Sequence, residues 1–79
     1  MNFQDLHERL TDHIAGKVSH GELTERGLAR RAGISQPHLH NVLKRKRFFS
    51  LQSADLVMRE LGLSVVDLIR ARAREESRS

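Results

Sequence analysis

The stretch QPHLHNVLKRKR, residues 36–47, places amide, imidazole and cationic side chains close together. Gln36 and Asn41 carry amides that can pair bidentately with adenine, and Lys or Arg can pair in the same way with guanine. The ring of Pro37 can contact a thymine methyl group. These residue types predict a surface that reads hydrogen-bonding edges and attracts an anion.

The charge of the chain is unevenly placed and is most basic around this stretch. The formal net charge is +4. Residues 1–25 carry two bases and five acids, residues 26–54 carry seven bases and no acid, and residues 55–79 carry five of each. An acid-free basic window indicates a surface that faces a polyanion. The alternative is a solvated basic face without a partner.

Length and composition predict one small helical domain. A chain of 79 residues supports a single domain, residues 1–79, and the absence of cysteine excludes a disulfide framework. A single proline and the lack of alternating β-branched runs favour an all-α fold. No apolar run approaches the ~18 residues of a membrane span, and the N-terminal residues are too acidic for a signal peptide. We therefore expect a soluble intracellular protein without a membrane partner.

Apolar spacing and capping residues predict five helices. The first is expected over about residues 2–15, followed by the loop GKVSHGE. Its apolar stripe consists of Phe3, Leu6, Leu10 and Ile14.

Capping residues also mark the ends of the second and fourth helices. Thr24 is a typical N-cap for a second helix that extends to about residue 32, and Gly33 stands where a helix ends in a left-handed conformation. Ser50 similarly begins the fourth helix and Gly62 ends it.

The third helix is expected over residues 36–44, with Ser35 as its N-cap. A proline in its first turn is tolerated because amides there lack intrahelical acceptors. At ~100° per residue, Leu39, Val42 and Leu43 fall on one buried stripe and leave the opposite face polar. The helix start and this polar face give the predicted base-reading residues, which are Gln36, Pro37, His38, Asn41 and Lys44.

The end of the chain predicts one short helix and a tail. Ser64 and Asp67 have the spacing of a capping box, which begins a fifth helix. The tail, residues 71–79, is basic and loses the apolar stripe, so it is expected to fray. The folded core is therefore expected over about residues 3–70.

The segments LTERGLARRAGISQPHLHNVLKRKR and SLQSADLVMRELGLSVVDLI together resemble the lambda-repressor-like (XRE family) helix-turn-helix DNA-binding domains. The resemblance covers roughly residues 23–69. It implies a five-helix all-α fold in which the third helix enters the major groove of DNA. It also implies a cytoplasmic, nucleoid-associated protein of prokaryotic or phage-like origin.

Phosphate contacts are expected on either side of the base-reading helix. The resemblance places them in the loop after that helix, and the amide-rich start of the second helix also favours a phosphate. The predicted phosphate-binding residues are Thr24, Arg26, Ser35, His40, Arg45, Lys46 and Arg47.

Two positions depart from the family pattern. Glu25 stands where glutamine commonly clamps a phosphate, so that role is assigned to Arg26 instead. Arg45 stands where glycine or asparagine commonly ends the third helix. A left-handed conformation there costs on the order of 1 kcal/mol, which a charge near DNA can offset.

Catalysis, cofactors and a metal site are not expected. His38 and His40 lie ~200° apart on a helix, and no cysteine or nearby carboxylate completes a ligand set. All five histidines are expected to be surface or groove groups. Of Phe48 and Phe49, one ring is expected in the core and the other partly exposed.

The expected function is sequence-specific binding of double-stranded DNA by a transcriptional regulator, with repression as the expected outcome. One monomer makes few base contacts, so a homodimer on a palindromic operator is expected, with half-sites about 34 Å apart. The predicted self-association patch contains Leu63, Val65, Val66 and Ile69.

Two other functions remain open. An antitoxin-like or adaptor module with the same fold would use the basic surface to bind an acidic protein partner, with weak salt dependence and no preference for duplex DNA. A non-specific nucleic-acid or RNA binder would bind any sequence and would not need Gln36 or Asn41.

Overall fold

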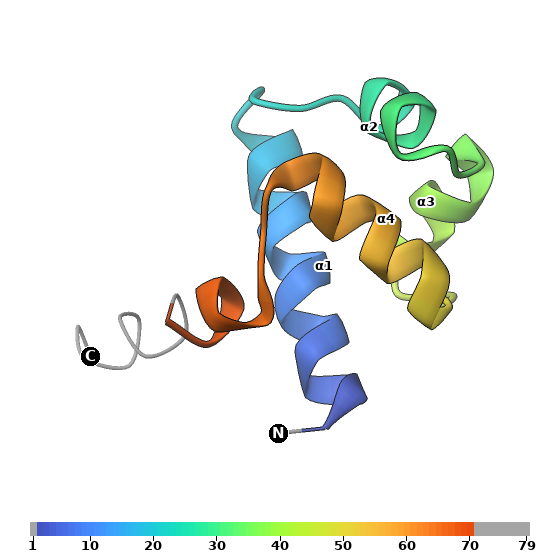
Figure 1. Ribbon diagram of the computed structural model, residues 1–79. Helices are drawn as coiled ribbons and strands as arrows, with labels where there is room; N and C mark the ends of the chain where they lie inside the picture. Colours follow the sequence, from blue (N-terminus) through green and yellow to red (C-terminus); the bar gives the residue numbers. More distant parts are fainter. Residues whose placement is uncertain (1, 71–79) are drawn as a thin grey trace.

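The structure, a computed structural model, describes residues 2–70 of the chain. Its four main helices are α1 (Phe3–Ser19), α2 (Glu25–Ala32), α3 (Gln36–Leu43) and α4 (Leu51–Leu61), and residues 65–70 are also helical. Figure 1 shows α2 and α3 together on one side of the molecule and residues 65–70 on the other. The described residues contain no strand, which confirms the all-α prediction.

The predicted helix starts are confirmed by hydrogen bonds from backbone amides to the capping side chains. Oγ1 of Thr24 accepts from Gly27 at 3.0 Å, and Oγ of Ser35 accepts from His38 at 3.1 Å. Such caps each stabilise a helix by about 1 kcal/mol. The other predicted caps are Ser50, which accepts from the amide of Ser53, and Ser64 and Asp67, which form the reciprocal capping box.

The predicted end of the first helix is wrong. α1 continues through Gly16 to Ser19 rather than ending near residue 15. Val18 packs partly buried against the core one turn after Ile14, so it continues the apolar stripe. Burial of this side chain outweighs the ~1 kcal/mol cost of a glycine inside a helix.

The start of α2 depends on a small residue at position 27. A Cβ atom built on Gly27 would lie 2.9 Å from Oγ1 of Thr24, which is shorter than any ordinary contact. The glycine therefore lets the capping hydroxyl approach the helix.

The core lies where α1, α2, α3 and α4 meet, with α2 packed on both α3 and α4. Leu39 and Val42 of α3 are fully buried, whereas Leu43 is only partly buried. Phe49 is 2% exposed and Phe48 is 65% exposed, which confirms the prediction for this pair. The fully buried apolar residues of α1 are Leu10 and Ile14, while Phe3 and Leu6 lie nearer the surface.

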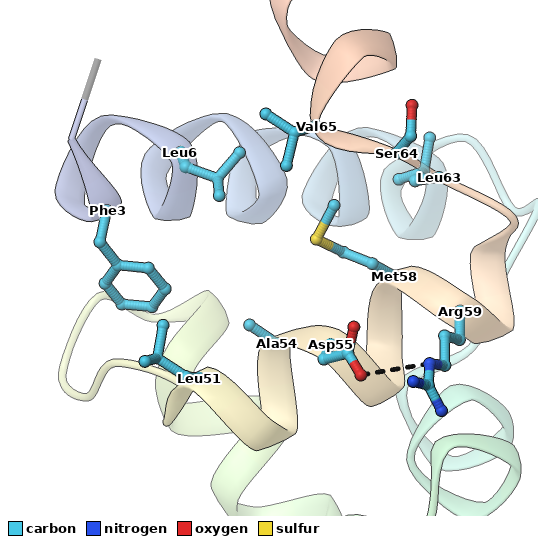
Figure 2. A pocket seen from close by; sticks show the side chains of 10 residues that line it. All are labelled: Phe3, Leu6, Leu51, Ala54, Asp55, Met58, Arg59, Leu63, Ser64 and Val65. Carbon is cyan, nitrogen blue, oxygen red and sulfur yellow. Dashed lines mark ion pairs between the residues drawn. The ribbon is translucent and has the colours of Figure 1, made fainter.

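An apolar groove of about 330 Å³ lies between α1, α4 and the segment that follows α4. Figure 2 shows Phe3, Leu6 and Val65 facing Ala54 and Met58 across it. An ion pair between Asp55 and Arg59, 3.1 Å long, lies at its rim.

Within residues 2–70, no helix combines the length and the apolar character needed to cross a lipid bilayer. The predicted frayed tail, residues 71–79, lies outside the described residues.

Candidate nucleic-acid interface

The predicted base-reading residues lie along α3 and at its end. The helix stops at Leu43, one residue earlier than predicted, and Lys44 is its C-cap. Gln36, Pro37 and Lys44 are exposed. The two remaining residues of the predicted set, His38 and Asn41, are half-buried.

His38 differs from the others because its ring also packs against the core. Its centroid lies 6.0 Å from that of the buried Phe49 ring, in an edge-on arrangement. The imidazole is therefore partly covered by Phe49 of the loop after α3. The surface that α3 offers to a ligand centres on its first turn and on Asn41 and Lys44.

The hydroxyls predicted to meet phosphate already accept hydrogen bonds. Oγ1 of Thr24 and Oγ of Ser35 cap α2 and α3, and both residues are exposed. A capping hydroxyl uses a lone pair of its oxygen and keeps its own hydrogen. Each of these side chains can therefore cap its helix and donate to a phosphate at the same time.

Most cations of the basic window carry no ion pair within residues 2–70. Arg31 is an exception because its guanidinium lies 3.0 Å from the carboxylate of Glu60 on α4. The exposed cations of this window without an acidic partner among the described residues are Arg26, Arg30, Lys44, Lys46 and Arg47. We call these five the unpaired cations; Arg30 was not among the predicted phosphate-binding residues.

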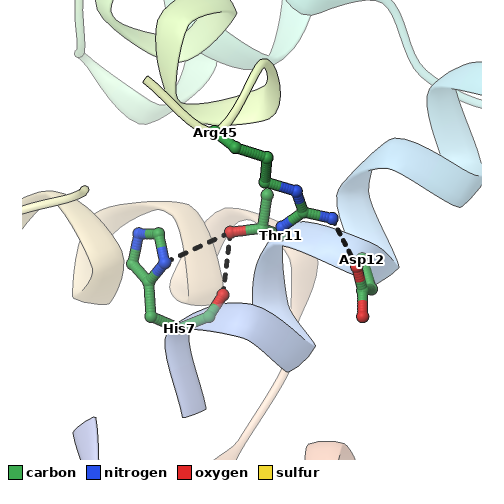
Figure 3. A network of polar contacts seen from close by, with 4 residues as sticks. All are labelled: His7, Thr11, Asp12 and Arg45. Atoms are coloured by element: carbon green, nitrogen blue, oxygen red, sulfur yellow. Dashed lines mark hydrogen bonds and ion pairs between the residues drawn. The ribbon is translucent and has the colours of Figure 1, made fainter. Parts of the chain in front are cut away.

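Arg45 adopts a left-handed conformation, with φ 64°. Its amide donates to the carbonyl oxygen of Val42 at 3.0 Å, and the next amide, of Lys46, donates to Asn41 at 2.9 Å. The side chain crosses to α1, where it forms an ion pair with Asp12 (Figure 3). Arg45 therefore ends α3 and ties the following loop to α1, in addition to its predicted role toward phosphate.

His40 links α3 to α2. Its Nδ1 atom lies 3.0 Å from a carboxylate oxygen of Glu25, which is about a quarter exposed. Glu25 thus has a partner within the protein besides its favourable place in the first turn of α2. The Nε2 side of His40 stays available to a ligand because the residue is exposed.

His7 is the residue that the sequence analysis missed. It is 4% exposed, so the expectation that all five histidines lie at the surface is wrong. The amide of Phe49 donates to Nε2 of His7 at 2.9 Å. On the other side of the ring, Oγ1 of Thr11 lies 3.4 Å from Nδ1 (Figure 3). The signal for its burial is its spacing, since residues 3, 7, 10 and 14 repeat at intervals of four, three and four.

The environment of His7 favours the neutral imidazole. Burial lowers the pKa of His7, the nearby guanidinium of Arg45 lowers it further, and Glu8 opposes them by a smaller amount. A neutral ring can accept the hydrogen bond from Phe49 only if its proton is on Nδ1. The hydroxyl of Thr11 donates to the carbonyl oxygen of His7 at 2.8 Å, which leaves its oxygen to accept that Nδ1 proton.

The described residues hold no group of three or more His, Cys, Asp or Glu side chains placed to bind a metal ion. Comparison of the chain with protein-family models, with curated proteins and with solved structures found no match. The function is therefore to be inferred from α2, α3 and the loop that follows them.

Proposed function

We propose that the protein is a sequence-specific regulator that binds double-stranded DNA and reads its major groove with α3. The observation that supports this proposal most directly is that α3 has a buried side and a polar side, and that the helix continues directly into a loop without acidic residues. Leu39 and Val42 anchor the helix on the core, Gln36 is exposed at the helix start, and the half-buried Asn41 and the exposed Lys44 belong to the polar side.

The arrangement of α2 and α3 supports this docking. In a helix-turn-helix protein the second helix lies in the major groove and its N-terminal residues contact base edges. α2 packs on α3, and a short turn with a left-handed Gly33 joins them. Gln36 begins α3, where an exposed amide can reach an adenine. A lambda-repressor-like order of five helices agrees with the four helices and the helical residues 65–70.

The unpaired cations supply the contacts to phosphate. They flank α3, with Arg26 and Arg30 on α2 and Lys44, Lys46 and Arg47 after α3. Because no carboxylate among the described residues neutralises them, their charge is available to the DNA backbone. Each neutralised phosphate adds about 0.9 to the salt dependence of binding, so the affinity should fall steeply with salt.

Specific binding by so small a surface requires two copies. Each good base contact contributes ~1–3 kcal/mol of discrimination, and one α3 offers only a few. A two-fold dimer on a palindromic operator, with α3 helices about 34 Å apart, doubles them. Val65, Val66 and Ile69 are 44%, 52% and 42% exposed, so the predicted self-association patch is largely open to a partner copy, whereas Leu63 is half-buried.

The test is selection of bound duplexes from a random DNA pool. The parent protein should enrich a palindromic motif, and Gln36→Ala/Asn41→Ala should weaken or relax that motif. Gln4→Ala is the matched control because Gln4 is an exposed amide at the N-terminal end of α1. Melting temperatures of all variants check that the half-buried Asn41 is not needed for folding. Binding without enrichment would reduce the protein to a charge-driven binder of nucleic acid.

A second candidate, an antitoxin-like or adaptor module, is favoured by the apolar groove between α1 and α4. Leu51 and Phe3 line this groove and are 71% and 38% exposed, so the groove offers contiguous apolar surface to a partner. This function predicts that duplex DNA does not bind even at low salt. A regulator that binds DNA and a partner protein would show both properties.

A further inference from the structure

The loop that joins α3 to α4 carries three of the five unpaired cations, so its conformation matters to any anionic ligand. At its start the chain is fixed by the left-handed turn at Arg45. At its end it is fixed by Phe49, whose ring is buried and whose amide donates to His7. Between these two points Lys46 and Arg47 are exposed.

The attachment at Phe49 depends on an imidazole that aromatic rings surround. The centroid of the His7 ring lies 5.9 Å from Phe3, 4.8 Å from Phe48 and 5.5 Å from Phe49. Within residues 2–70, its polar contacts are the amide of Phe49 on Nε2 and the hydroxyl of Thr11 on Nδ1. A buried amide that loses its acceptor in such surroundings pays the desolvation cost of an unmade hydrogen bond.

We propose that His7 is a positioning residue for DNA binding. Its neutral imidazole holds the loop 44–49 in the conformation that presents Lys46 and Arg47 to phosphate, and its protonation releases the loop and weakens DNA binding. This inference rests on the proposed function. It adds to that function a sensitivity to acid at a residue that does not touch the DNA.

The chemistry of the imidazole gives the direction of the effect. An imidazolium carries protons on both nitrogens and cannot accept from the amide of Phe49. The two N–H groups would then face each other at a position where 2.9 Å now separates the nitrogen atoms. The loop must move to separate them, and Lys46 and Arg47 move with it.

Two charged groups act on His7, Arg45 in the loop and Glu8 on α1. Asp12 of α1 lies beyond Arg45 as its ion-pair partner, and His38 of α3 packs edge-on with the Phe49 ring. Asp12 already forms an ion pair with Arg45, so it does not stabilise an imidazolium strongly. Because burial and then the Arg45 guanidinium disfavour the imidazolium, the pKa of His7 in the folded protein lies below the unfolded value of 6.5. The contribution of His7 to the free energy of unfolding is therefore fully present above pH 6.5 and is lost as the pH falls through the pKa of His7 in the folded protein.

The predicted trend opposes the ordinary effect of acid on a DNA-binding protein. Protonation of exposed histidines adds positive charge, which strengthens binding to phosphate as the pH falls. Release of the loop weakens binding over the same range. A loss of affinity on acidification that depends on His7 therefore cannot come from charge alone.

The experiment measures the affinity for a fluorescent duplex, the selected motif or a random sequence, at constant ionic strength. The two conditions are about pH 7.5 and a pH below the midpoint of the His7 titration, which NMR gives. The parent protein should lose affinity by about tenfold, a factor that corresponds to ~1.4 kcal/mol. His7→Gln should lose less than about twofold, because the end of a glutamine side chain can accept from the Phe49 amide without titrating. His20→Gln is the matched control because His20 is exposed, and it should behave as the parent does.

A second measurement follows the amide of Phe49 by NMR without DNA. Its shift and its hydrogen-exchange protection should change with the His7 titration in the parent and should not change in His7→Gln. The proposal would be overturned if His7→Gln lost as much affinity on acidification as the parent protein. It would also be overturned if the shift and protection of the Phe49 amide did not change as His7 titrates. Failure to bind any duplex at pH 7.5 would overturn the proposed function and the DNA part of this inference, while the NMR titration still decides whether His7 holds the loop.

Discussion

The arginines at positions 31 and 45 lie in the same acid-free window as Lys46 and Arg47, yet the fold uses the two pairs differently. Arg31 and Arg45 reach carboxylates on other elements, Glu60 on α4 and Asp12 on α1. Lys46 and Arg47 are exposed and have no acidic partner within residues 2–70.

This difference separates cations that join elements from cations that remain for a ligand. Both ion pairs connect residues far apart in the sequence, so they contribute to the packing of α2 and the loop on the rest of the domain. The carboxylates needed for them come from outside the basic window. A count of charges in the window therefore overstates the number of cations without an acidic partner by two, Arg31 and Arg45.

The largest effect is expected from Lys46→Ala/Arg47→Ala, which removes two unpaired cations and tests whether these cations, unlike the ion-paired ones, bind DNA. DNA affinity should fall about tenfold or more at low salt, and the slope of log affinity against log salt should fall by about 2. The melting temperature should hardly change because exposed side chains without partners contribute little to stability. Binding titrations at several salt concentrations measure the first effect and thermal unfolding the second.

Arg59→Ala is the control for this double variant. Arg59 is 77% exposed and pairs with Asp55 on its own helix at the rim of the apolar groove. Its loss removes a cation without touching α3 or the loop, so affinity and salt slope should stay near the parent values. An effect of Arg59→Ala about half that of the double variant, in proportion to the one charge removed instead of two, would mean that net charge rather than the unpaired cations governs binding.

The sequence predicts the helices well because their ends depend on local hydrogen bonds. Thr24, Ser35 and Ser50 each accept from an amide three residues later, and Gly33 and Gly62 adopt left-handed conformations. The positive φ of Arg45 was considered on other grounds, because the family resemblance commonly places glycine or asparagine at this position. The predicted end of α1 was wrong because packing of Val18 against the core, rather than the local preference of the residues around Gly16, decides how far that helix continues.

The partners of the polar side chains could not be predicted in the same way. Asp12 and Arg45 are 33 positions apart, His7 and Phe49 are 42 positions apart, and His40 and Glu25 are 15 apart. Such pairs depend on how the helices pack, which local patterns do not fix. The sequence therefore places residues on faces of α3 but does not show which cations the fold will pair.

Arg45→Gly should have smaller effects of opposite sign on melting temperature and on DNA affinity, and it tests to which group of cations Arg45 belongs. Glycine adopts a φ of 64° without the cost of ~1 kcal/mol that arginine pays, but the ion pair with Asp12, worth ~0–1 kcal/mol, is lost. The melting temperature should therefore rise modestly. DNA affinity should fall if Arg45 exchanges Asp12 for a phosphate in the complex. Unchanged binding would show that Arg45 belongs wholly with the cations that join elements.

Asp12→Asn should have the smallest effect and the opposite sign in binding. Removing this carboxylate frees the Arg45 guanidinium at the edge of the loop, so DNA affinity should rise a few-fold while stability falls by ~0–1 kcal/mol. Asp5→Asn is the matched change, since Asp5 is exposed near the N-terminus of α1 and its amide, not its side chain, makes the capping hydrogen bond to Asn2. If both variants raise affinity equally, the gain comes from lower negative charge on α1. If only Asp12→Asn raises the affinity, the ion pair itself holds Arg45 away from DNA. Arg45 would then act as one of the unpaired cations once its carboxylate partner is removed.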